Sequence, residues 1–368
     1  MKELSRRQFL TVSGLAAGGV LVAACSKPAT PEPAAPTPKP DEPTAVPDTP
    51  VPVEDLPWPR GDVPRERRFE WMMGYSSGQF GDVGLVNPYG GASHQYSLAA
   101  SLEPLLYYSA FADKTYPWLA ESWTFNDDAS EVKVFIRKGV KWSDGVPFTG
   151  KDLVFTLNML FDYAPQLRNS AVLKSKIKEV QLEDDYTVNI VLNQPDYRFI
   201  FSYFAFRYDL GTYIVPEHIF KDVEDVMTFG FFDPEKGWPV VTGAYQTTEF
   251  ELQYKKLDLR YDWWAVELGL LEMPEVEQIV QQPLADLTVA AQLIINNELD
   301  TALGFQPQTI KSIVDQAPQV ITHTMRENPY GYIDWWPLSM WFNTLEKPYD
   351  DPRVRWAVAY AINQQQMI

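Results

Sequence analysis

Residues 118–157 read WLAESWTFNDDASEVKVFIRKGVKWSDGVPFTGKDLVFTL. Apolar and polar side chains alternate over residues 122–125 and again over 132–136, which is the pattern of strands with one buried face. The residues between these two runs, Asn126-Asp127-Asp128, favour a turn. The first half of the stretch therefore predicts a β-hairpin.

The second half of the stretch predicts turns and a helix. Turns are expected at Lys138-Gly139 and at Ser143-Asp144-Gly145. Thr149 can cap a helix that runs from Lys151 through Met159. Elsewhere, alternation predicts a strand at residues 67–73, and helical spacing of apolar residues predicts a helix at residues 95–108.

The stretch 118–157 resembles the signature region of family 5 of the extracellular solute-binding proteins, the oligopeptide-binding group that serves ABC importers. Val146 and Gly150 are mild departures from the family pattern. The residues that match it are Leu119, Ala120, Glu121, Trp123, Arg137, Lys138, Gly139, Trp142, Asp144, Gly145, Pro147, Phe148, Thr149 and Asp152.

Four later segments resemble the same family in order and spacing. Asn297 stands where the family usually has Gly. The segments are DDYTVNIVL at 184–192, TGAYQTTEFELQYKKLDLRYDWW at 242–264, IINNELDTAL at 294–303 and MWFNTLEKPYDDPRVRWAVAYAINQQQMI at 340–368.

This resemblance implies an α/β (mixed α+β) chain with the two-lobed periplasmic-binding-protein fold of type II. On that map, residues 66–115 and 236–303 form the core of lobe I, residues 116–235 form an extra β-rich subdomain, and residues 304–368 begin lobe II. Family members run on for about half as long again, and the helix predicted at 350–368 ends without a cap. The resemblance therefore implies that lobe II is incomplete in this sequence.

The N-terminus predicts export and lipidation. Residues 1–24 carry the pair Arg6-Arg7 and then an apolar stretch shorter than the roughly 20 residues that span a bilayer, which predicts a twin-arginine-type signal peptide. Val22-Ala23-Ala24-Cys25 resembles a bacterial lipobox, which implies a lipid on Cys25; the alternative is a cytoplasmic helix with a buried cysteine. Residues 25–65 hold Cys25 and a proline-rich segment, which predicts a disordered tether or, alternatively, a ligand for a partner domain.

Composition excludes some partners. The formal net charge is −18, so nucleic acid is excluded as a partner because its phosphates need a basic surface. Cys25 is the one cysteine, so no internal disulfide can form. The three histidines stand apart in the sequence, each without an evident acid partner, and no histidine cluster favours a metal site.

Gly74-Tyr75-Ser76-Ser77-Gly78 fits the G-x-S-x-G pattern of a serine-hydrolase nucleophile elbow. That elbow needs a helix directly after the serine, and the loop residues after Gly78 disfavour one. Hydrolysis by Ser76 is therefore the remote alternative. A strand that ends in such a loop favours ligand binding at a sheet edge, so Tyr75, Ser76, Ser77 and Gln79 are predicted to contact a ligand.

Trp335 and Trp336 are the predicted contacts from lobe II, because flat rings can stack on sugars or on peptide side chains; the alternative is that they pack within the lobe. The family resemblance marks the WSDGVPF stretch as structural and makes the strand-end Asn343 a backbone-bonding residue.

The resemblance implies a monomeric, extracytoplasmic lipoprotein that needs no cofactor and works with ABC permease subunits. An oligopeptide is the default ligand that the family resemblance implies, and the surplus of aromatic residues in this chain favours an oligosaccharide as the alternative.

Overall fold

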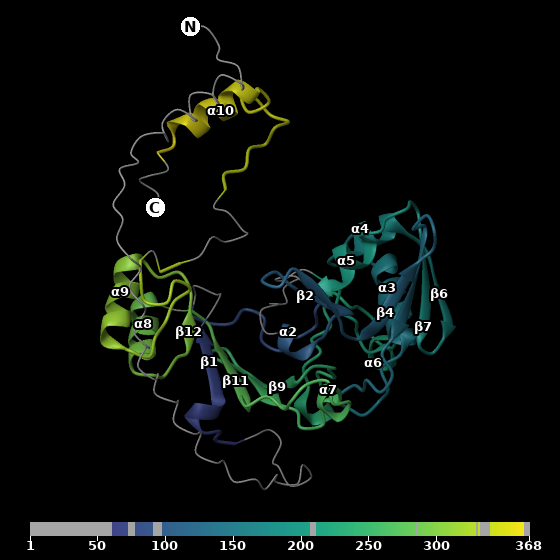
Figure 1. The fold of residues 1–368 in the computed structure, drawn as a ribbon, viewed down its shortest axis with the longest axis horizontal. Coiled ribbons are helices and arrows are strands. Elements are labelled where there is room, and N and C mark those ends of the chain that lie inside the picture. Colours follow the sequence, from purple (N-terminus) through teal and green to yellow (C-terminus); the bar gives the residue numbers. More distant parts are fainter. Residues whose placement is uncertain are drawn as a thin grey trace, which may run out of the picture. The chain divides into compact units, whose positions relative to one another are not determined.

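The stretch 118–157 forms the hairpin and the capped helix that its sequence predicts. The computed structural model describes residues 61–72, 78–90, 98–206, 211–284, 286–328, 330–331 and 339–363 (Figure 1). In it, β4 (Ala120–Phe125) pairs antiparallel with β5 (Glu131–Ile136). The helix α3 (Gly150–Asp162) follows, with Thr149 as its N-cap. Thr149 and Asp152 form a reciprocal capping box, since the Thr149 N–H donates to Asp152 Oδ2 at 2.8 Å.

A four-stranded antiparallel sheet grows outward from this hairpin. Its order is β4-β5-β7-β6, where β6 is Ile177–Asp184 and β7 is Thr187–Leu192. Every second side chain of β5 and most of β7 are buried, and α3 contributes three fully buried leucines to the same core. In β5, the alternation that predicts the strand is therefore the alternation of its buried and less buried faces.

The helix predicted at residues 95–108 is mostly wrong. Of the described residues in this range, 98–108, only those of α2 (Leu98–Ser101) are helical. β2 (Leu106–Ser109) is a strand that pairs antiparallel with β3 (Lys114–Pro117) and parallel with β8 (Ala205–Phe206). Pro104 disfavours helical geometry at the residue before it and cannot continue the helical hydrogen bonds. Pairing with β3 then gives Leu106–Ser109 an extended conformation.

A five-stranded mixed sheet carries the residues of interest. Its order is β12-β1-β11-β10-β9, and the strand predicted at 67–73 is its β1 (Arg68–Met72). β1 runs parallel to β11 (Gln278–Gln282) and to β12 (Thr301–Ala302). β10 (Lys255–Leu259) runs antiparallel to β11 and to β9 (Tyr245–Phe250). Strands more than 200 residues apart in sequence therefore lie side by side.

One face of this sheet has its own small core. Met72 packs with Ala290, Ala291 and Ile294 of α8 (Leu287–Ile295) and with Ile313 of α9 (Pro307–Gln316). In Figure 1, α8 and α9 lie together beside β12. The other elements are η2 (Arg65–Arg67), α4 (Ser170–Lys176), α5 (Phe199–Phe204), α6 (Glu217–Phe220), η3 (Pro234–Lys236), α7 (Trp264–Glu267) and α10 (Pro352–Ala361).

The helix predicted at 350–368 begins where expected but ends earlier. Asp351 caps α10 and Pro352 occupies its first turn, whereas Ile362 is already extended. No residue of α10 is buried, so its apolar stripe lacks a packing surface within the described part of the chain. None of the described helices combines the length and apolar character that crossing a membrane would demand.

Candidate functional site

Three parallel strands end at the same edge of the five-stranded sheet. β1 ends at Met72, β11 at Gln282 and β12 at Ala302, and the register pairs Met72 with both of the other two end residues. The carboxyl edge of parallel strands is where open α/β sheets place ligands. This edge is therefore the first place to look for a binding site.

A cavity of about 480 Å³ lies at this edge, beside the end of β12. That volume falls within the range of about 300–1,000 Å³ that is usual for small-molecule sites. Its walls come from α8, α9, β12 with the residues on either side of it, and residues 320–323 and 330–331. Apolar side chains predominate, with a few polar groups among them; lining residues include Thr301, Phe305, Ile310, Thr322, His323 and Tyr330.

One ion pair and one backbone hydrogen bond join Asp300, the residue before β12, to η2 and β1. Asp300 accepts from the Arg65 guanidinium at 2.9 Å and from the Glu70 backbone N–H at 2.7 Å. Glu70 itself is buried, and burial raises the pKa of its carboxyl group, while a hydrogen bond from Gln282 opposes that shift. Asp300 is the last residue of the IINNELD segment, and its ion pair and hydrogen bond explain why an acidic residue stands at this position.

The predicted contacts after β1 fall only partly within the described residues. Tyr75, Ser76 and Ser77 lie outside them, and Gln79 is exposed. Phe80 directly after it is buried, its N–H donates to the Leu252 carbonyl at 2.8 Å, and its ring meets that of Phe250 edge-on. Met72, before residues 73–77, thus belongs to the five-stranded sheet, and Phe80, after them, packs on Phe250 of its strand β9.

The predicted contacts from lobe II lie outside the described residues, since both Trp335 and Trp336 do. The described residues just before them, Tyr330 and Gly331, line the cavity. Asn343 bonds the backbone as expected, because its side-chain oxygen accepts from the Leu345 N–H at 3.1 Å.

Sequence reasoning missed the cavity residues Thr301, Phe305 and Tyr330. The sequence signal that could have found this region was the turn residue Gly304 together with Pro307, which follow the short strand at 301–302.

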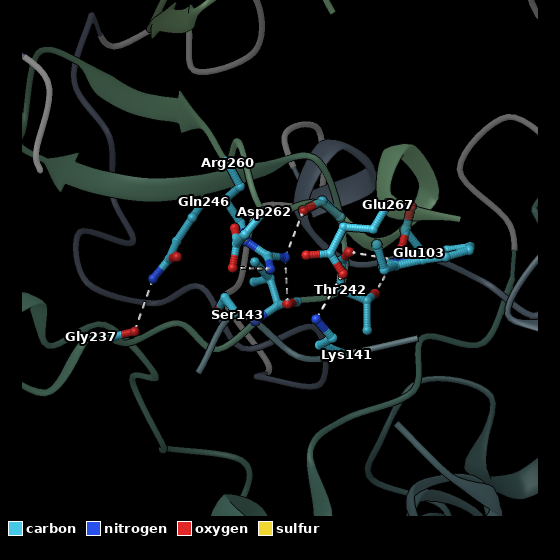
Figure 2. A network of polar contacts seen from close by, with 12 residues as sticks. Glu103, Lys141, Ser143, Gly237, Thr242, Gln246, Arg260, Asp262 and Glu267 are labelled. Carbon is cyan, nitrogen blue, oxygen red and sulfur yellow. Dashed lines mark hydrogen bonds and ion pairs between the residues drawn. The ribbon is translucent and has the colours of Figure 1, made fainter. Parts of the chain in front are cut away.

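A second polar centre joins segments that lie far apart in the sequence (Figure 2). Glu103 is buried, and its two carboxylate oxygens accept from the indole N–H groups of Trp118 and Trp264, each at 2.9 Å. Burial raises the pKa of Glu103 to about 7, although these hydrogen bonds and Arg260 oppose the shift. Arg260 donates to the carbonyls of Val241 and Gly243, both at 3.1 Å. Every member is engaged with another, which indicates a structural joint.

The WSDGVPF stretch is held in the same structural way. The Ser143 N–H donates to the Val241 carbonyl, and the Ser143 hydroxyl accepts from the Val241 N–H.

The prediction that His218 lacks an acid partner is wrong, since its Nε2 lies 2.8 Å from Asp144 Oδ2. The two residues are 74 positions apart, so only the folded chain reveals the pair. Among the described residues, no group of three or more His, Cys, Asp and Glu side chains could hold a metal ion.

The comparisons with known proteins agree on one family. The model of the bacterial extracellular solute-binding proteins, family 5, matches residues 114–368. The glutathione-binding protein GsiB of Escherichia coli K12 is 26% identical over 251 residues, which are 68% of this chain and 44% of that protein.

Solved structures share the fold. A mannohexaose-bound periplasmic oligopeptide-binding protein from Thermotoga maritima gives a TM-score of 0.68 at 26% identity, covering 83% of this chain and 53% of that one. AppA of Bacillus subtilis, solved with a nonapeptide, gives 0.54 at 19% identity over 67% of this chain and 45% of that one. The chain thus spans about half the length of these relatives. The predicted two-lobed α/β fold class is confirmed, and the chain belongs to family 5 of the bacterial extracellular solute-binding proteins.

Proposed function

We propose that this chain captures an oligopeptide outside the cytoplasm and delivers it to an ABC importer. The observation that carries the proposal is the 480 Å³ cavity at the carboxyl edge of parallel strands in a chain of this family. Family 5 proteins are extracytoplasmic and bind small molecules for ABC permeases. The relative named for glutathione, itself a tripeptide, supports a peptide as the ligand class here. The protein acts by binding, without catalysis.

The ligand contacts we propose come from both sides of the cavity. Tyr75, Ser76, Ser77 and Gln79 directly follow β1, the strand that neighbours β12 in register. Trp335 and Trp336 follow Tyr330 and Gly331, which line the cavity wall. Both groups are therefore connected by a few residues of chain to positions at the cavity, which supports their roles as contacts.

An oligosaccharide is the second candidate. It is favoured by a specific relative, the Thermotoga protein that was solved with mannohexaose bound. Stacking of sugar faces on Trp335 and Trp336 would supply the main apolar contact of such a ligand. Hydrolysis by Ser76 remains the remote alternative, and an ester-turnover assay of Ser76→Ala against the parent chain tests it.

The remaining parts of the chain are assigned in the same proposal. Residues 1–24 direct twin-arginine export through Arg6 and Arg7, Cys25 carries the lipid, and residues 25–65 tether a monomeric binding domain to the membrane. The lobe I core comprises residues 66–115 and 236–303. These ranges contain all five strands of the mixed sheet, β1, β9, β10, β11 and β12. The subdomain 116–235 contains all of β4 to β7, and lobe II begins at 304.

Thermal shift tests the ligand class. The full-length chain is heated alone and with trialanine, other short peptides, mannohexaose or cello-oligosaccharides. A ligand at 100 times its Kd stabilises the folded chain by roughly 2.7 kcal/mol, which is a measurable rise in Tm. A shift with peptides supports the proposal, and a shift with sugars alone replaces the peptide by the oligosaccharide. No shift with either class contradicts the proposed capture.

A further inference from the structure

Strand β11 carries three glutamines, and one of them is unlike the other two. Gln278 donates to Asp258 Oδ1 at 2.8 Å, and Gln282 donates to Glu70 Oε2 at 3.2 Å. Gln281 is 0% exposed, yet neither its amide nitrogen nor its amide oxygen has a hydrogen-bond partner among the described residues. A buried amide without partners destabilises a fold, and such groups call for an explanation. Successive strand residues point to opposite faces of a sheet, so the Gln281 side chain lies on the opposite face from those of Gln278 and Gln282.

Gln281 belongs to a row of side chains that crosses the carboxyl edge of the sheet. The register aligns Thr301 with Trp71, Trp71 with Gln281, Gln281 with Lys255, and Lys255 with Phe250. Thr301, at one end, lines the cavity. Neighbouring strands lie about 4.8 Å apart, so Gln281 stands about 10 Å from Thr301, which is the span of an extended tripeptide.

The other end of the row is also polar and buried. Lys255 is 1% exposed, and its Nζ lies 4.5 Å from the centre of the Phe250 ring and 5.8 Å from that of Phe80. Burial lowers the pKa of Lys255 to about 8, with Asp82 opposing the shift. Apolar packing against this face of the sheet does not account for the buried amide of Gln281 beside the buried ammonium group of Lys255. Both groups suit a polar ligand that arrives from the sheet edge.

We propose that Gln281 is a specificity-determining residue, whose side-chain amide forms the paired donor and acceptor hydrogen bonds to a solute that extends from the cavity across the strand ends. The inference rests on the proposed function, since it names a contact of the same site. One amide presents one donor face and one acceptor, which matches the C=O and N–H of a peptide unit in the bound ligand.

The test compares two glutamines on opposite faces of β11. Gln281→Met and the control Gln278→Met are made in the full-length chain, and Gln281→Leu tests a side chain of another shape. Each variant is measured for Tm without ligand and for Kd with trialanine and with mannohexaose. Gln281→Met removes a buried amide that lacks partners, so we expect its Tm to rise by about 2 °C and its Kd to weaken about tenfold or more. Gln278→Met breaks the hydrogen bond to Asp258 at the end of β11 that lies away from the carboxyl edge, so we expect a lower Tm and an unchanged Kd.

Three results overturn the inference, and they are distinguishable. If both Gln281 variants lower Tm and leave Kd unchanged, the amide has a structural partner such as an internal water. If they raise Tm but leave Kd unchanged, the amide does not contact the solute. If the unmodified chain binds neither probe, the proposed function fails and the inference fails with it. A weakened Kd together with a raised Tm supports the inference, because a purely structural role cannot give opposite signs.

Discussion

Replacing Glu103 by Gln should change how the stability of this protein depends on pH. Glu103 is 3% exposed and accepts one indole N–H on each carboxylate oxygen, from Trp118 and from Trp264. The Trp264 N–H also donates to the Thr242 carbonyl at 3.1 Å, whereas among the described residues the Trp118 N–H donates only to Glu103. A glutamine can turn its oxygen to Trp118, but its NH₂ group then meets the Trp264 N–H. We expect the exchange to destabilise the protonated state by about 1 kcal/mol, the lower end for a disturbed buried hydrogen bond.

The pH dependence follows from the raised pKa of Glu103, about 7 in the folded chain against an ordinary value of 4.5. Between these two pH values the folded chain holds a proton that the unfolded chain has lost. The free energy of unfolding of the parent chain therefore falls as the pH rises from about 4.5 to 7, by about 3 kcal/mol, and this contribution is level above pH 7. The amide of the Glu103→Gln variant cannot titrate, so that contribution is missing. Given the loss of about 1 kcal/mol in the protonated state, the two stabilities should cross at about pH 5, and the variant should be the more stable protein by about 2 kcal/mol at pH 7 and above.

Urea unfolding of the full-length chain, followed by tryptophan fluorescence at pH 5, 6, 7 and 8, measures this difference. Glu121→Gln at an exposed position is the control and should run parallel to the parent. Adding Trp118→Phe to Glu103→Gln closes a double-mutant cycle, in which we expect a coupling of about 1 kcal/mol. A Glu103→Gln variant that runs parallel to the parent at all four pH values would refute the reasoning, because it would mean that the carboxylate is ionised throughout.

Three further changes have expected outcomes. Gly243→Ala places a Cβ 2.6 Å from the carbonyl oxygens of Ala100 and Ser101, so we expect a loss of about 1–3 kcal/mol or more in urea unfolding, without a change in ligand class. Thr149→Ala removes one half of the capping box of α3, so the urea midpoint should fall by the equivalent of about 1 kcal/mol, and Thr149→Ser should restore it. Lys255→Met removes a buried ammonium whose folded pKa of about 8 lies below its ordinary 10.5. The parent therefore gains stability as the pH rises from 8 to 10.5, and the Tm advantage of the Met variant should be largest near pH 7 and shrink by pH 10; an equal difference at both would contradict this.

Some features needed only the local sequence. The hairpin at 118–136, the Thr149 cap and the strand at 68–72 follow from alternation, turn residues and a capping pair within a few positions of each other. The same local reasoning failed at 102–108, because it extended the helical spacing across Pro104 and missed the hairpin that Leu106–Ser109 forms with Lys114–Pro117. The family could be predicted from the order of several motifs along the chain, and that order does not depend on any single tertiary contact.

The site divides in the same way. The sequence alone placed a ligand loop after β1 and aromatic contacts near 335, as predictions that rest on residue type and resemblance. It carried no sign that Asp144 meets His218, that Glu103 joins Trp118 to Trp264, or that Gln281 lies between Trp71 and Lys255 with its amide unpaired. Local sequence determines the conformation of a segment, because its backbone preferences depend on near neighbours. Which distant side chains meet, and which buried polar group is left without a partner, depends on the register of strands more than 200 residues apart, and only the tertiary structure decides that.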